Sequence, residues 1–152
     1  MIDPAAFDRD VRSEIAEHIR ALGAVPSVAE VASRLAVPDT DVAGAFDRLA
    51  AARVMILRPG TTDILSFNPF AAGTTDFRVR ADGRDWWGLC AWDAFGIVAA
   101  LASDGLVQGA CADGCGVPLE VRLAGDAVGA LDGVVMQFGL PARDWWKDII
   151  FT

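Results

Sequence analysis

The sequence predicts an α+β fold in two parts: a helical, N-terminal part over residues 1–70 and a second part over residues 71–152 with a mostly antiparallel sheet and one buried helix. Apolar residues recur every three to four positions in the first part and in short strand-like runs in the second. A polar, glycine-containing break at residues 68–76 separates the two. With 152 residues, 53% of them hydrophobic, the chain can bury a core without disulfide bonds.

The N-terminal part reads as three helices and a hairpin. The first helix is indicated by five apolar residues at helical spacing: Phe7, Val11, Ile15, Ile19 and Leu22. Gly23 ends that helix, and Ser27 with Glu30 three residues later has the capping-box spacing that begins a second one. A third helix is predicted over residues 40–52. Two short apolar runs, 54–57 and 64–67, then flank Pro59-Gly60 as a β-hairpin.

Helix, helix, helix and hairpin is the pattern of a winged-helix domain, whose third helix commonly reads DNA. The charge argues against that role here. Residues 1–68 carry seven arginines against ten acidic residues, and the whole chain has a net charge of −8. Because DNA binding needs positive charge to neutralise phosphates, we expect no nucleic-acid partner and assign this domain a packing or lid role.

The chain shows no membrane-spanning run of about 18 apolar residues, and its first residues lack the basic and apolar regions of a signal peptide. We therefore expect a cytoplasmic protein with no membrane partner. The sequence does not predict an oligomeric state.

The second part begins with a strand over residues 77–80 and a hairpin turn at Asp82-Gly83. Trp86-Trp87 follow on the return strand or at the start of a helix, and residues 89–102 read as a buried helix. Three further short strands are predicted at Val107–Ala110, Leu119–Leu123 and Val134–Phe138.

Cys90 and Asp93 are the clearest candidates for a reactive site. Residues three apart on a helix share one face, so the spacing places a thiol beside a carboxyl group. A carboxylate alone raises the pKa of a neighbouring thiol, so activation of Cys90 needs a helix N-terminus or a soft metal, both of which favour the thiolate. The structural alternative is a buried apolar cysteine beside an aspartate that serves as a cap or ion-pair partner.

Cys111 and Cys115 lie in a glycine-containing turn that resembles half of a metal knuckle. His18 is the only histidine, and we expect it at the surface of the first helix. A four-ligand zinc site would need all three cysteines and His18 together. A thiophilic metal such as Hg(II) or Cu(I) needs only two or three thiolates, so a soft metal fits this chain better than zinc.

These residues resemble the alkylmercury lyase, or organomercurial lyase, family over most of the chain. The resemblance rests on the three N-terminal helices with Pro26-Ser27 opening the second, on the segment Cys90-Ala91-Trp92-Asp93 before an apolar helix, and on Cys111 in a turn leading into the strand at 119–123. It implies that Cys90 attacks mercury as a thiolate and that Asp93 protonates carbon as the carbon–mercury bond breaks. It implies a structural role for Cys111.

The chain departs from the family pattern at the second catalytic cysteine, which the family has in its C-terminal part. Residues 144–152 contain no cysteine. One interpretation is that the chain stops before that cysteine, and the end of the chain on an apolar strand favours it. The other is that this member of the family has lost the cysteine. A third interpretation is that Cys115 supplies the second thiolate, which makes Cys90 and Cys115 the predicted mercury ligands.

Three functions follow from these observations. The first is an enzyme that cleaves organomercurials by protonolysis, needs no cofactor and holds Hg(II) as its bound product. The second is a non-catalytic protein with the lyase fold that binds a soft metal, mercury or copper, or a thiol ligand. The third is a winged-helix regulator with a metal-sensing second part.

The tryptophan pairs Trp86-Trp87 and Trp145-Trp146 are expected in the core. The alternative is that they form an aromatic wall around the organic group on the metal.

Overall fold

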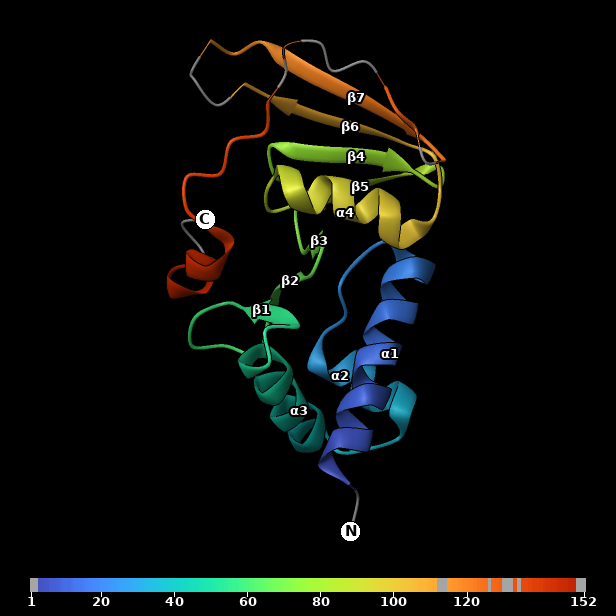
Figure 1. Ribbon diagram of the computed structural model, residues 1–152. Coiled ribbons are helices and arrows are strands. Elements are labelled where there is room, and N and C mark those ends of the chain that lie inside the picture. The colour runs from blue at the N-terminus through green and yellow to red at the C-terminus, as the bar shows by residue number, and fades with distance from the viewer. Residues whose placement is uncertain (1–2, 112–114, 126, 130–132, 134, 150–152) are drawn as a thin grey trace.

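The computed structural model describes residues 3–111, 115–125, 127–129, 133 and 135–149. It confirms a mixed fold of helices and antiparallel sheets (Figure 1). The three N-terminal helices lie at the end that holds the N-terminus, and the five-stranded sheet lies at the opposite end (Figure 1). Among the described residues, no helix is both long enough and apolar enough to span a membrane.

The three N-terminal helices are α1 (Pro4–Leu22), α2 (Val28–Leu35) and α3 (Asp39–Ala51). Gly23 ends α1 with a left-handed backbone, and Ser27 and Glu30 form the predicted capping box of α2. Each helix turns its apolar stripe inward. The fully buried side chains include Ile15 from α1, Val31 from α2 and Phe46 from α3.

One expectation about α1 is wrong: His18 is buried, with only 4% of its surface exposed. His18 follows the buried Ile15 by three positions and precedes the buried Ile19. The helices packed on α1 therefore cover a wider stripe than its apolar residues alone define.

The hairpin after α3 consists of β1 (Met55–Leu57) and β2 (Ile64–Phe67), as predicted, and β2 pairs in turn with β3 (Phe70–Ala71). The predicted break at 68–76 thus contains a short strand. The turn between β2 and β3 contacts helix α4 (Ala91–Leu101), because a Cβ placed on Gly96 would lie 3.2 Å from the Cβ of Pro69.

The larger sheet has the strand order β5-β4-β6-β7-β8, with every described pairing antiparallel. Its strands are β4 (Phe77–Ala81), β5 (Arg84–Gly88), β6 (Gly105–Ala110), β7 (Pro118–Ala124) and β8 (Ala127–Val128). Asp82-Gly83 forms the predicted β4–β5 turn, and both residues have positive φ. Trp86 and Trp87 lie on the return strand.

Helix α4 packs on one face of this sheet, on the side that faces the N-terminal helices (Figure 1). Ala94 and Ile97 of α4 are fully buried with Val79 of β4. The buried apolar residues of the N-terminal helices and of the sheet belong to one continuous cluster. The core therefore extends across the predicted boundary near residue 70.

The C-terminal segment differs from its predicted strands. Residues 135–138 have no regular secondary structure, and residue 134 lies outside the described residues. Ala142–Lys147 form a 3₁₀ helix, and the apolar strand expected at the chain end falls mainly on residues 150–152, which lie outside the described residues. In Figure 1 this segment leaves the large sheet and returns toward β1 and α3. The described residues of this segment pair with no strand of either sheet.

We predict that Gly88→Ala destabilises the fold by about 1–3 kcal/mol, the usual cost of forcing an extra methyl group into a packed site. A Cβ at Gly88 would lie 2.7 Å from the backbone nitrogen of Ala94 and 2.9 Å from the Cβ of Asp93. Urea unfolding measures the loss. Gly73→Ala is the matched control, because a Cβ at Gly73 meets nothing within 4 Å. Equal stability of the two variants would contradict the close approach of β5 and α4.

Candidate functional site

A cavity of about 430 Å³ lies where three segments of the chain meet. The segments are the start of α4, the β1–β3 region and the C-terminal residues 136–149. The described lining residues are Ile56, Asn68, Phe77, Leu89, Cys90, Ala91, Trp92, Asp93, Met136, Gln137, Phe138, Gly139, Trp145, Trp146 and Ile149. Most are apolar or aromatic, and Cys90 and Asp93 are the two with reactive side chains. This composition is typical of a small-molecule site.

Cys90 is the N-cap residue of α4 and has an extended backbone, while its carbonyl accepts the first helical hydrogen bond from Ala94 N–H at 3.1 Å. Asp93 lies in the first helical turn. Both residues are half-buried. The strand before them is held in place because Thr75 Oγ1 donates to the Gly88 carbonyl at 2.5 Å. The thiol and the carboxyl group thus enter the cavity from one fixed helix start.

Burial raises the pKa of the Cys90 thiol above its ordinary value, and the charge of Asp93 raises it further. The backbone N–H groups of Asp93 and Trp92 act in the opposite direction without cancelling this effect. Burial also raises the pKa of Asp93, although the Leu89 N–H and the Cys90 side chain favour its charged form. Both groups are therefore shifted toward their protonated states.

Aromatic rings form much of the cavity wall. The Trp92 and Phe138 rings meet edge to face with centroids 6.0 Å apart, and Phe138 contacts Trp145 with centroids 5.4 Å apart. Trp145 Nε1 donates to the Leu140 carbonyl at 2.9 Å. The guanidinium of Arg53 lies 5.7 Å from the centre of the Trp146 ring. These contacts place the C-terminal segment against the start of α4 and against Arg53, which precedes β1.

The two tryptophan pairs have different positions. Trp86 is buried in the core, as expected, and its Nε1 donates to the Ala81 carbonyl. Trp145 and Trp146 instead line the cavity, so the core expectation is wrong for that pair. Sequence reasoning missed the contributions of Ile56, Asn68 and residues 136–138, and no local sequence signal marks them, since only the fold brings them to Cys90.

The cysteines are distributed unevenly around this cavity. Cys90 and Asp93 line it together, as expected from their spacing, while Cys115 is exposed and is not among its described lining residues. Cys111 follows β6, and its N–H donates to the Val117 carbonyl. Within the described chain, no three His, Cys, Asp or Glu side chains are grouped to hold a metal ion. That finding gives the zinc alternative no support.

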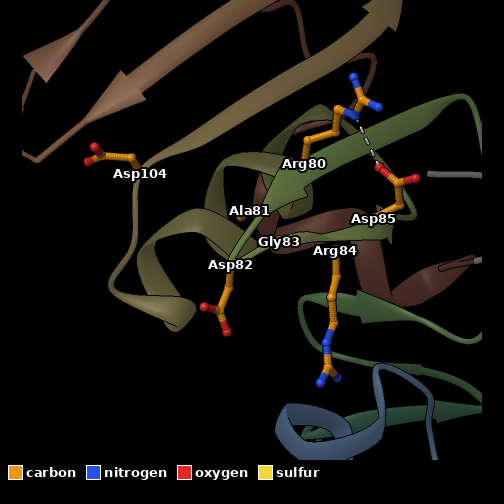
Figure 2. A pocket seen from close by; sticks show the side chains of 7 residues that line it. All are labelled: Arg80, Ala81, Asp82, Gly83, Arg84, Asp85 and Asp104. Carbon is orange, nitrogen blue, oxygen red and sulfur yellow. Dashed lines mark ion pairs between the residues drawn. The ribbon is translucent and has the colours of Figure 1, made fainter.

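A second hollow, of about 420 Å³, surrounds the β4–β5 turn (Figure 2). Its charged lining residues are Arg80, Asp82, Arg84, Asp85 and Asp104. Figure 2 shows Arg80 paired with Asp85 and Arg84 directed toward α1, where its guanidinium donates to the Ala21 carbonyl at 2.9 Å. These arginines are engaged in structural contacts, and the described lining residues include no thiol, so we do not take this hollow as the candidate site.

The fold and the site together define an α+β protein with a thiol and an acid in one aromatic-walled cavity. Comparison with known proteins makes the assignment specific. A family model for alkylmercury lyase, MerB, matches residues 70–152. The chain therefore belongs to the alkylmercury lyase family.

A solved structure described as the mercury-bound form of MerB2 shares the fold, with a TM-score of 0.64 and 19% sequence identity. The alignment covers 81% of this chain and 58% of that one, so the chain spans less than two thirds of the length of that relative. A search of the curated proteins finds no match.

We predict that Asp93→Asn lowers the pKa of Cys90, because it removes a negative charge that disfavours the thiolate. The pH midpoint for alkylation of Cys90 by iodoacetamide, followed on its peptide by mass spectrometry, should move to lower pH. Burial, the larger cause of the raised pKa, remains in the variant, so the shift is partial. Asp63→Asn, in the β1–β2 loop and not among the described lining residues of the cavity, should leave the midpoint unchanged. An unchanged midpoint in Asp93→Asn would show that the two groups are not coupled.

Proposed function

We propose that the protein cleaves the carbon–mercury bond of organomercurials by protonolysis, with Cys90 binding mercury and Asp93 delivering the proton to carbon. The observation that carries this proposal is the thiol and the carboxyl group sharing one cavity in a chain of the alkylmercury lyase family. The likeness to a mercury-bound MerB2 structure supports it.

The raised pKa values suit this chemistry. At neutral pH the Cys90 thiol keeps its proton, and Asp93 is a stronger base than an exposed carboxylate. As sulfur bonds to mercury, the thiol proton passes to Asp93. The carboxyl group then gives that proton to the carbon, which keeps the electron pair of the breaking carbon–mercury bond. The products are a hydrocarbon and Hg(II) bound to the Cys90 sulfur.

The second thiolate is the open part of this proposal. Cys115 remains our candidate, since Cys90 is the cysteine found among the described lining residues. Cys115 is exposed and lies in the loop before β7. To act, it would have to approach mercury from outside the cavity as the complex forms.

A non-catalytic binder of soft metals, mercury or copper, is the second candidate function. The finding of one thiol, rather than two, among the described lining residues favours it. One thiolate and one acid can hold mercury, whereas efficient bond cleavage calls for electron density from a second sulfur. Turnover distinguishes this candidate from the enzyme.

The N-terminal part, which we describe as a winged-helix domain of residues 1–70, is proposed to close the site of the 71–152 domain rather than to bind DNA. Ile56 and Asn68 line the cavity, and Arg53 stacks on Trp146. Its third helix begins with Asp39 and Asp41, which repel phosphates. A cytoplasmic location would suit the proposed substrate and the reduced thiols.

The test is to incubate the protein with phenylmercury and to measure benzene release and retained mercury. Asp93→Asn should lower the rate of benzene release by about 100-fold or more, as expected for loss of a general acid, while mercury stays bound. Cys90→Ser should lose both. Asp63→Asn serves as the matched carboxylate control with unchanged turnover.

The Cys115→Ser variant tests whether Cys115 supplies the second thiolate. If Cys115 takes part, turnover falls while a single mercury remains bound at Cys90. Multiple turnovers that survive Cys115→Ser would exclude Cys115 from the mechanism. Mercury retention that is unchanged in Cys90→Ser would remove Cys90 from the site and contradict the proposed function.

A further inference from the structure

We infer that Trp92, Phe138 and Trp145 form a wall that binds an aromatic substituent on mercury, so that the site prefers aryl over alkyl organomercurials. This inference rests on the proposed function for its reaction. Its physical basis, an aryl-binding wall beside Cys90 and Asp93, can be tested without that reaction.

The three rings form a connected series in the lining of the cavity. Phe138 is the central ring, in contact with Trp92 on one side and with Trp145 on the other. The Trp92–Phe138 pair is T-shaped with an interplanar angle of 68°, whereas Phe138 and Trp145 are tilted by 40°. Aromatic rings prefer these edge-to-face and tilted arrangements because the electron-rich face of one attracts the electron-poor edge of another. A further aryl ring can extend the series by the same contacts.

Two of the three rings, Trp92 and Trp145, are positioned by contacts within the protein itself. Trp92 belongs to the first turn of α4, between Cys90 and Asp93 in sequence. The hydrogen bond from Trp145 Nε1 to the Leu140 carbonyl orients the Trp145 indole. A wall fixed in this way loses little conformational entropy on binding.

Two of the rings keep much of their surface accessible, although large apolar side chains are usually covered. Trp92 is 58% exposed and Phe138 is 46% exposed. Both line the cavity, and neither belongs to the buried core. Binding of an apolar group would remove this surface from water.

The size of the cavity agrees with such a ligand. An apolar cavity of roughly 150 Å³ accommodates benzene, and this one measures about 430 Å³. It therefore has room for a phenyl ring together with mercury. A methyl group could bind mercury equally well but would leave the aromatic wall uncovered.

The first experiment compares phenylmercury with methylmercury in the full chain. Phe138→Leu keeps an apolar side chain but removes the central ring. We expect the ratio of kcat/KM for phenylmercury to that for methylmercury to fall about 2- to 10-fold, the usual worth of one aromatic pair. Trp92→Leu should change the ratio in the same direction.

Phe7→Leu is the matched control. Phe7 is a partly buried phenylalanine of α1 that lies outside the cavity lining, so the same substitution there should leave the ratio unchanged. A ratio that is equal in wild type, Phe138→Leu and Phe7→Leu would overturn the inference. Loss of both activities together in Phe138→Leu, with no change in their ratio, would also count against it.

A second experiment needs no mercury chemistry. The indole resonances of ¹⁵N-labelled tryptophans are followed during titration with benzyl alcohol and with cyclohexylmethanol, which are similar in size but differ in aromaticity. The Trp92 and Trp145 signals should respond to benzyl alcohol with an affinity about 2- to 10-fold higher, and Phe138→Leu should abolish that preference.

The two experiments separate the inference from the proposed function. A preference for benzyl alcohol without cleavage of any organomercurial would leave the aryl site standing and reject the enzyme. Cleavage with equal binding of the two alcohols would keep the enzyme and reject the aromatic wall as a specificity determinant.

Discussion

The close approach of strand β5 to the first turn of α4 is the constraint on which the site depends. Gly88 lies against the backbone of Ala94 with no room for a side chain, and Thr75 Oγ1 donates a hydrogen bond to the Gly88 carbonyl. Ala94 is itself fully buried, so the start of α4 is fixed between the sheet and the core. Cys90 and Asp93 flank this contact. Backbone packing therefore holds the helix start that carries both residues, and their side chains also interact directly by a hydrogen bond.

Burial and reactivity are linked at this helix start. The apolar walls that surround Cys90 and Asp93 make both charged forms less favourable, which raises the two pKa values together. The backbone N–H groups at the start of α4 oppose the effect at Cys90, as helix N-termini generally do. A thiol that keeps its proton and a carboxylate that accepts one readily are suited to the proton transfer that we propose.

The cavity also explains how the two predicted parts of the chain depend on each other. The β2–β3 turn packs on α4 through Pro69 and Gly96, and Arg53 lies over Trp146 of the C-terminal segment. Arg84 joins the β4–β5 turn to the last carbonyls of α1 on another side of the molecule. An N-terminal helical part fixed at several such points is suited to form a wall of the site.

Local patterns in the sequence determined the elements whose stability is local. The capping box at Ser27, the left-handed end of α1 at Gly23 and the Asp82-Gly83 turn were predictable, because each depends on residues within a few positions of one another. The spacing of Cys90 and Asp93 on one helix start was predictable for the same reason.

The burial of His18 was not predictable from the sequence, since it depends on which helices cover α1. Residues 135–138 pair with none of the described strands, although their sequence pattern predicted a strand. Only the tertiary structure brings Phe138, Trp145 and Ile56 to the cysteine, since long-range packing, and not local spacing, decides which distant segments share a cavity.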